Sequence, residues 1–174
     1  AIYDESQVEY LNAFLSHFKG VRIISTDPLV IETYDDNVQL DAELNVQTWW
    51  PNYADGPAGW HNLTVGIRAE GAHSLAFTES KADSLGVEWM NFTAGTSLGI
   101  LEGYLTESVL SNYIPYTPTL SAYITGVEAQ ARWANLQAWY TTHVNFWLGT
   151  GPFYLEAITP TLTLQRFADF PDPS

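Results

Sequence analysis

Residues 95–99 are the clearest candidate for covalent chemistry in the sequence. They read Gly95-Thr96-Ser97-Leu98-Gly99 and match the G-x-S-x-G pattern of a nucleophile elbow, which presents a serine on a sharp turn between a strand and a helix. The chain order also fits a catalytic triad, because His143 lies downstream as a candidate base, and the acid would be Glu102, Glu107 or Glu128. A serine esterase-like hydrolase that uses Ser97 is therefore one alternative function.

The segment before this motif argues against catalysis. The elbow strand of such hydrolases is buried on both faces and is continuously apolar, whereas residues 87–93 read Val-Glu-Trp-Met-Asn-Phe-Thr and interleave polar side chains. No glycine-rich oxyanion loop precedes the motif, and short motifs often match by chance. A simpler role for Thr96 or Ser97 is to cap the helix that follows. We therefore expect no catalytic residue and no enzyme activity.

Neither the histidines nor the carboxylates show the spacing of a metal site. None of the four histidines belongs to an H-x-H or H-E-x-x-H pattern, so solvated or hydrogen-bonded roles are expected, with no metal and no cofactor. A carboxylate pair for glycoside hydrolysis needs two acids in close proximity, but among 20 acidic residues any choice is arbitrary. The histidines are His17, His61, His73 and His143, and the acids considered are Asp35, Asp36, Asp55 and Asp169.

Charge and aromatic content indicate the kind of partner. The chain has 6 basic and 20 acidic residues, a net charge of −14, so a nucleic acid or an anionic membrane surface would be repelled. Only 15% of residues are charged, but 14% are aromatic, with 7 Trp and 10 Tyr. Exposed rings commonly bind sugars, peptides or proteins. The absence of cysteine excludes disulfides and thiolate chemistry.

A loop with three rings is the best sequence candidate for binding. Trp49-Trp50-Pro51-Asn52-Tyr53 precedes a Gly/Pro stretch, and rings at a loop tip cannot all be buried locally. The candidate ligand-binding residues are Trp49, Trp50 and Tyr53. The alternative is that the two tryptophans fill the edge of the core beneath the loop. Two N-glycosylation sequons, at Asn62 and Asn91, carry little weight because the pattern is common by chance.

Hydrophobic spacing and turn residues predict an α+β fold. Because strands do not alternate regularly with helices, we expect antiparallel β-hairpins packed with several helices in a single domain of residues 1–174. A capping box at Thr125-Gly126-Val127-Glu128 opens one helix, and Gly20 and Gly86 are expected to stop two others. The ranges predicted as helices are 4–19, 60–77, 79–85, 97–113 and 125–143; those predicted as strands are 21–26, 29–34, 153–158 and 161–167.

The tail contains a glycine-proline corner. Residues 146–155 read Phe-Trp-Leu-Gly-Thr-Gly-Pro-Phe-Tyr-Leu, in which Gly149 and Gly151 allow positive φ or close backbone approach and Pro152 fixes the direction of the next strand. The corner and the hairpin after it contain no nucleophile, metal ligand set or phosphate cradle. This part of the chain is therefore expected to hold a shape.

Three segments resemble one family. They are similar to segments of solute-binding family 5, the extracytoplasmic solute-binding proteins of ABC importers that take up peptides and nickel. The stronger matches are Gly149 to Leu155 and Leu164 to Phe170, and the weaker match is Gly20 to Thr33. Phe153 and Phe170 stand where that family more often has tyrosine. The likeness is loose elsewhere, and the family's second lobe has no counterpart here.

This resemblance implies a non-catalytic piece of one lobe of a periplasmic-binding-protein-like fold. The chain, which begins at Ala1, would be excised from a longer, exported protein of the periplasm or cell surface. Its expected partners are a small solute (peptide, oligosaccharide or chelate), the rest of the parent protein and an ABC permease. Family solutes contact residues scattered over both lobes, so the resemblance assigns no ligand residue. A surface protein-interaction module that binds through Trp49 and Trp50 is a further alternative.

Overall fold

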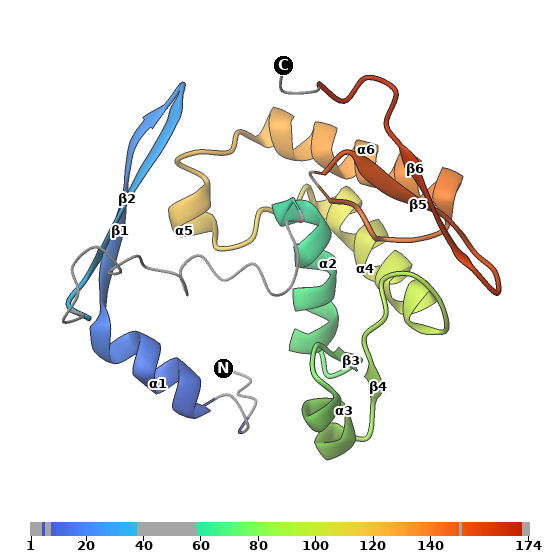
Figure 1. Cartoon of the computed structure of the whole chain (residues 1–174), viewed down its shortest axis with the longest axis horizontal. Helices are drawn as coiled ribbons and strands as arrows, with labels where there is room; N and C mark the ends of the chain where they lie inside the picture. The colour runs from blue at the N-terminus through green and yellow to red at the C-terminus, as the bar shows by residue number, and fades with distance from the viewer. Residues whose placement is uncertain (1–4, 6–7, 38–58, 150, 172–174) are drawn as a thin grey trace. The chain divides into compact units, whose positions relative to one another are not determined.

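The structure is a computed structural model and describes residues 5, 8–37, 59–149 and 151–171. It combines helices with antiparallel two-stranded sheets (Figure 1), which confirms the expected α+β class. The chain divides into two compact units, Ala1–Asn52 and Tyr53–Ser174, and each is described by itself. The expectation of a single domain excised from a longer protein stays a prediction.

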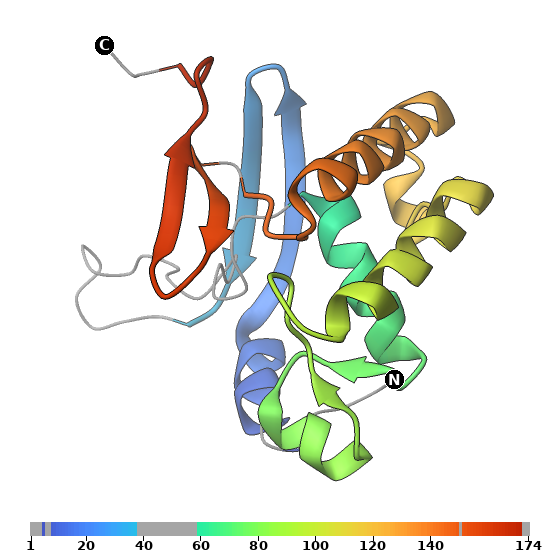
Figure 2. The same ribbon diagram turned by 90° about the vertical axis from the view of Figure 1, so that its right-hand side faces the viewer.

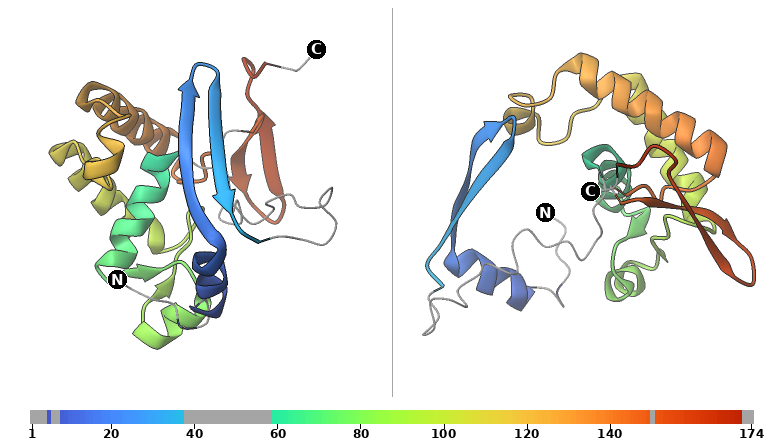
Figure 3. Two further views of the ribbon diagram at one scale, coloured as in Figure 1. Left: turned by 90° about the vertical axis from the view of Figure 1, so that its left-hand side faces the viewer. Right: turned by 45° about the horizontal axis from the view of Figure 1, so that its top comes forward.

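The first unit is a short helix followed by a β-hairpin. Helix α1 (Val8–His17) leads directly into β1 (Phe18–Thr26), which pairs with β2 (Leu29–Asp35) in antiparallel register. Figure 3 shows this hairpin as a long twisted ribbon that continues from the helix. The β-branched residues on both sides of Asp27-Pro28 therefore form the predicted strand pair.

The helix ends earlier than the sequence indicated. Gly20 is not its C-terminal stop but lies inside β1 at φ +149°, next to a bulge. The helix ends at His17 because the chain after β2 bonds to it there: the amide of Asp36 donates to the carbonyl of His17. The carboxylate of Asp36 also pairs with the ring of His17 at 2.9 Å and with Lys19 at 2.7 Å. These contacts pair the chain with β2 from Phe18 onward.

No described side chain of this unit is buried. Residues 8–37 are all at least partly exposed, although Phe14 stacks on Phe18 with ring centroids 4.7 Å apart. Large apolar side chains are exposed along α1 and both strands: Tyr10, Leu15, Val21, Ile23, Ile24, Leu29, Val30, Ile31 and Tyr34. Helix and hairpin thus present an apolar surface rather than a core of their own.

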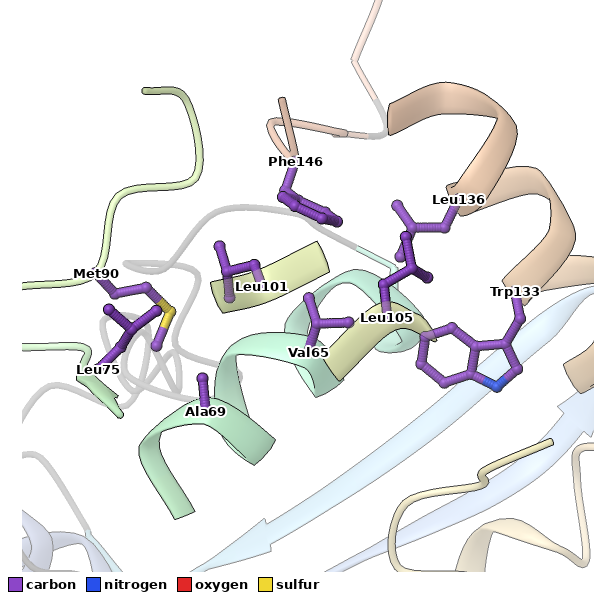
Figure 4. Packing of buried hydrophobic residues seen from close by; sticks show 9 residues of the cluster. All are labelled: Val65, Ala69, Leu75, Met90, Leu101, Leu105, Trp133, Leu136 and Phe146. Carbon is purple, nitrogen blue, oxygen red and sulfur yellow. The ribbon is translucent and has the colours of Figure 1, made fainter. Parts of the chain in front are cut away.

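The second unit is built around three helices. Helices α2 (Trp60–Gly71), α4 (Ser97–Ser111) and α6 (Gly126–His143) pack against one another in pairs (Figure 2). Figure 4 shows their inward side chains meeting with residues from two extended segments and from the stretch after α6. This core consists of Val65, Ala69, Leu75, Met90, Leu101, Leu105, Trp133, Leu136 and Phe146.

A small parallel strand pair closes one end of these helices. Strand β3 (Leu75–Ala76) pairs with β4 (Glu88–Trp89) across helix α3 (Glu79–Leu85). The predicted bounds of α3 are confirmed, and Gly86 stops it in the left-handed conformation at φ +66°. The helix predicted over 60–77 was too long, because the chain leaves α2 after Gly71 and passes through His73 at φ +57°.

The predicted ends of the other elements are largely correct. Helix α4 is confirmed except for its last two residues, and α6 begins at the predicted capping box, in which Thr125 and Glu128 hydrogen-bond reciprocally. A one-turn helix, α5 (Thr117–Leu120), lies between the two helices predicted over 97–113 and 125–143 and was not predicted. Its sequence, Thr-Pro-Thr-Leu, has Pro at the first turn, where a missing N–H costs nothing.

The closing hairpin packs on α6 through rings. Strands β5 (Phe153–Ile158) and β6 (Leu162–Arg166) pair as predicted. The ring of Tyr154 meets Trp139 and His143 of α6, with centroids 5.8 and 5.2 Å apart, and lies 4.9 Å from Phe167. His143 itself stacks on Trp139 at 3.9 Å.

The glycines of the corner do not have the role expected of them. Neither Gly149 nor Gly151 has φ in the left-handed range, and a Cβ at either would meet nothing closer than 3.9 Å. The corner is instead fixed by the backbone bond from the Phe167 amide to the Pro152 carbonyl, 2.9 Å long. That bond joins the start of β5 to the end of β6. Thr150 lies outside the described residues.

Gly66 allows three core side chains to touch helix α2. A Cβ at this position would lie 2.8 Å from each of the Sδ atom of Met90 and the Cζ atoms of Phe77 and Phe92. Real Cβ atoms do not approach so closely, and the two phenyl rings are rigid. The absence of a side chain at Gly66 is therefore what lets the two strand-end segments pack directly against the helix backbone.

We expect Gly66→Ala to destabilise the protein by about 1–2 kcal/mol, because overpacking outweighs the better helix propensity of alanine. The matched control is Gly103→Ala in α4, where a Cβ would meet nothing within 4 Å; it should be neutral or stabilise by up to about 1 kcal/mol. Urea unfolding of the two variants measures both. Equal effects of the two substitutions would contradict the packing described for Gly66.

Candidate ligand-binding surface

The binding candidates chosen from sequence lie outside the described residues. Trp49, Trp50 and Tyr53 fall in residues 38–58, so their assignment stays a prediction. The same is true of Asp55. The remaining candidates for chemistry in the second unit lie among the described residues.

Ser97 is a buried structural residue. Its side chain is fully buried, and its hydroxyl donates to the Glu88 carboxylate at 2.6 Å and accepts from the Asn91 amide at 3.1 Å. The same carboxylate accepts the backbone N–H of Ser97 at 3.2 Å and the hydroxyl of Thr96. Glu88 thus caps the first turn of α4 and ties it to β4. Burial leaves the hydroxyl no route to a substrate.

The residues proposed to activate Ser97 are engaged elsewhere. Glu107 pairs with Arg68 at 2.8 Å, Glu128 belongs to the capping box of α6, and Glu102 accepts from the hydroxyl of Tyr140 at 3.4 Å. His143 stacks on Trp139. None of the described contacts brings an imidazole to Ser97. The described contacts therefore assemble no triad at the G-x-S-x-G match. The expected cap by Thr96 or Ser97 is also wrong: Thr96 is the N-cap residue but its side chain bonds no helix amide, and the Glu88 carboxylate accepts the Ser97 amide in its place.

His61 is the most perturbed titratable group that the structure describes. Only 8% of this residue is exposed, and burial, together with the nearby charge of Arg132, lowers the pKa of its imidazole to about 4. Its ring packs edge-on to Trp60 and Trp133. Its Nδ1 atom has no hydrogen-bond partner among the described residues. His61 is thus held neutral at the start of α2.

The two glycosylation sequons lie in different environments. Asn62 is buried in the first turn of α2, so a glycan cannot be attached there in the folded protein. Asn91 is exposed, and its Oδ1 atom accepts from the amide of Thr93 at 2.8 Å, the hydroxyl of Thr93 at 2.7 Å and the amide of Ala94 at 3.2 Å. Asn91 therefore shapes the loop between β4 and α4.

Two distant segments meet in the second unit and form an open, ring-lined hollow. The segment that follows β4 and the segment that follows α6 are joined by a backbone hydrogen bond from the Phe146 amide to the Phe92 carbonyl, 2.7 Å long. Between them lies a hollow of about 250 Å³, which we call the tryptophan hollow. It is lined by Trp89, Met90, Asn91, Phe92, Thr93 and Trp147.

Alternation along both segments turns the two indoles outward. Met90 and Phe146 belong to the buried core, and Phe92 packs against it. Their neighbours Trp89 and Trp147 are each 55% exposed. Successive side chains of an extended chain point to opposite sides, so Met90 and Phe92 point inward and Trp89 outward. Around Trp147 the chain turns tightly, with the Leu148 amide donating to the Phe146 carbonyl at 2.9 Å, and Phe146 and Leu148 pack inward on either side of the outward indole. The apolar residues at 90 and 92 and at 146 and 148 are the sequence signal that points to Trp89 and Trp147.

Hydrogen bonds hold both sides of the hollow in place. The indole N–H of Trp89 donates to the carbonyl of Phe77 at 3.1 Å, which orients the ring although it is exposed. The amide of Trp147 donates to the Oδ1 atom of Asn145 at 3.0 Å, and the side chain of Asn145 donates to the carbonyl of His143 at 3.1 Å. Trp147 is thereby fixed to the end of α6.

A second hollow adjoins the first. It has a volume of about 290 Å³ and lies between Thr93 and Ala94, the end of α6 with His143 and Asn145, and residues 155–158 of β5. Thr93 lines both hollows. Next to this lining, partial burial and the neighbouring Glu156 carboxylate raise the pKa of the Tyr154 phenol above its ordinary value.

The structure gives no sign of a metal site or a membrane span, within the part of the chain that it describes. Among the described residues, no group of three or more His, Asp or Glu side chains is arranged to hold a metal ion. None of the helices in the described ranges is long and apolar enough to cross a membrane. No protein-family model matches the chain, and no curated protein matches it.

Removing the hydroxyl of Ser97 should affect stability and not reactivity. We expect Ser97→Ala to cost about 1–3 kcal/mol, because the part-buried Asn91 amide loses its acceptor and the Glu88 carboxylate loses a donor; Ser111→Ala, which removes an exposed hydroxyl at the end of the same helix, should cost much less. A fluorophosphonate probe should not label the folded wild-type protein. Labelling that disappears in Ser97→Ala would support a hydrolase instead.

Burial of neutral His61 should make stability depend on pH. The folded-state pKa lies below the ordinary value of 6.5, so this contribution is fully present above pH 6.5 and is lost as the pH falls toward 4. The loss at pH 4 should reach about 3 kcal/mol. Urea unfolding between pH 4 and 7 measures it. In His61→Asn the slope should flatten, whereas in the control His73→Asn, at an exposed histidine, it should persist. An unchanged slope in His61→Asn would contradict the assignment.

Proposed function

We propose that this chain is a non-catalytic part of one lobe of an extracytoplasmic solute-binding protein of an ABC importer. Its surface would contribute to binding a small solute, and a permease and the rest of the parent protein would be its partners. The proposal combines the sequence resemblance with the geometry of the second unit. It assigns the protein to the periplasm or the cell surface and gives it no cofactor.

The observation that carries the proposal is the use of the resembling residues as scaffolding. Arg166, at the centre of the Leu164 to Phe170 segment, donates from its guanidinium to the carbonyls of Phe167 at 3.3 Å and Phe170 at 3.0 Å. Tyr154 joins the ring cluster on α6, and Leu155 is buried. Tyr154 thus fixes the hairpin onto α6, and Arg166 holds the turn that follows β6, as expected of a framework that presents a surface.

The reactive groups of the described chain support the same conclusion. Ser97 and His61 are buried and serve packing and hydrogen bonding. The hollows, by contrast, are open. The tryptophan hollow is lined by rings, one amide and one hydroxyl, and the second hollow also has the imidazole of His143 and the carboxylate of Glu156. Pockets of this composition bind small molecules by shape and a few polar contacts. Closure of a second lobe over such a surface would supply specificity.

A thermal-shift screen of the complete parent protein tests the proposal. Neutral peptides, oligosaccharides and metal chelates should be added at millimolar concentration. A solute present at about 100 times its Kd stabilises the folded state by about 2.7 kcal/mol, which raises Tm by roughly 5–10 °C for a folding unit of about 150–250 residues. The absence of a shift with every solute would contradict the proposed function.

The interaction-module alternative depends on Trp49 and Trp50. Nine large apolar side chains are exposed on the first unit. Exposed apolar surfaces of this kind often bind another protein. Pull-down with a Trp49→Ala/Trp50→Ala variant separates the two ideas. A protein partner lost in this variant, with no solute bound by the wild type, would favour the interaction module.

A further inference from the structure

We propose that the tryptophan hollow binds a neutral sugar ring. The inference rests on the proposed function and deepens it, because it names the class of solute and the residues that hold it. It depends on the size of the hollow, on its two exposed indoles and on the free polar groups beside them.

The size and polarity of the hollow suit one ring. Its volume of about 250 Å³ lies just below the usual range of pockets for drug-sized ligands, about 300–1,000 Å³. None of its six lining residues carries a charge. An ionised peptide terminus or a phosphate would find no counter-ion there, and the net charge of −14 repels anions further. A neutral ligand meets neither penalty.

The indoles provide the apolar part of the recognition. One face of a pyranose ring exposes C–H groups, which are slightly positive, and the face of an aromatic ring is slightly negative. Trp89 and Trp147 are 55% exposed and belong to the same hollow. The polar edge of Trp89 already donates to the carbonyl of Phe77, so the part that remains for a ligand is the apolar ring. Its fixed orientation lowers the entropy lost on binding.

Free polar groups beside the rings can receive the hydroxyls. In the described part of the chain, neither the indole N–H of Trp147 nor the side-chain NH₂ of Asn91 has a hydrogen-bond partner, whereas the Oδ1 atom of Asn91 is used three times. Asn91 thus presents donors only. The hydroxyl of Thr93 donates to Asn91 and keeps lone pairs to accept. Donors and an acceptor therefore lie beside two apolar faces, as a sugar requires.

The test is calorimetric titration of the parent protein with cellobiose, maltose and trialanine, the last as a neutral-side-chain peptide probe. At least one sugar should bind, and Trp89→Ala and Trp147→Ala should each weaken it about tenfold. The matched control is Tyr123→Ala, which removes an equally exposed ring (53%) outside the hollow and should leave the affinity within about twofold. Circular dichroism establishes that each variant is folded.

A second measurement does not depend on the variants. In an ¹⁵N-labelled wild-type protein, the bound sugar should shift the side-chain NH₂ resonances of Asn91 and the indole N–H resonance of Trp147. The indole N–H resonance of Trp133 should not move, because that group donates to the Tyr113 carbonyl within the core. This holds even if Trp89→Ala fails to fold.

Each remaining outcome overturns the inference in a distinguishable way. Sugar binding that survives both tryptophan substitutions and leaves the Asn91 resonances unmoved places the sugar elsewhere. Binding of trialanine without either sugar refutes the sugar assignment and leaves the proposed solute-binding function standing. Binding of none of the three probes, together with no shift in the wider thermal screen, removes both.

Discussion

The backbone hydrogen bond from the Phe146 amide to the Phe92 carbonyl is the constraint on which the candidate surface depends. It is 2.7 Å long and joins two segments that are far apart in the sequence. The ring of Phe146 is fully buried and stacks on Tyr140 with centroids 4.6 Å apart. The bond is therefore shielded from water, where an unmade partner would be costly. Without it, Trp89 and Trp147 would not border one hollow.

The Glu88 carboxylate supports the same surface from the other side. It holds the hydroxyl and amide of Ser97, and Ser97 in turn holds the amide of Asn91. A motif that resembles a catalytic elbow is thus used to fix the loop that carries Asn91 and Thr93. A catalytic serine must be accessible to a substrate, whereas a structural serine can be fully buried, as Ser97 is.

Local signals in the sequence predicted most of the elements. The capping box at Thr125, the stop at Gly86 and the β-branched strands around Asp27-Pro28 act through neighbours in the chain, and each prediction was confirmed. The error at the end of the first helix came from a contact between residues far apart in the sequence. Gly20 reads as a helix stop, but Asp36 pairs with His17 and draws the chain into β1 earlier.

The candidate site was harder to predict for the same reason. Trp49, Trp50 and Tyr53 are candidates because rings at a loop tip cannot all be buried locally, and they lie outside the described residues. The apolar residues that flank Trp89 and Trp147 indicate that both indoles point away from the core, but only the pairing of Phe92 with Phe146 shows that they share a hollow. No local pattern encodes that pairing.

The central claim is that the second unit holds a small solute between its two exposed indoles and performs no reaction at Ser97. The most direct measurement is a crystal structure of the complete parent protein with its solute bound. The account predicts solute atoms in contact with the rings of Trp89 and Trp147, with the hydroxyl of Ser97 still bonded to Glu88. A solute in contact with Ser97, or one bound with both indoles left in solvent, would contradict it.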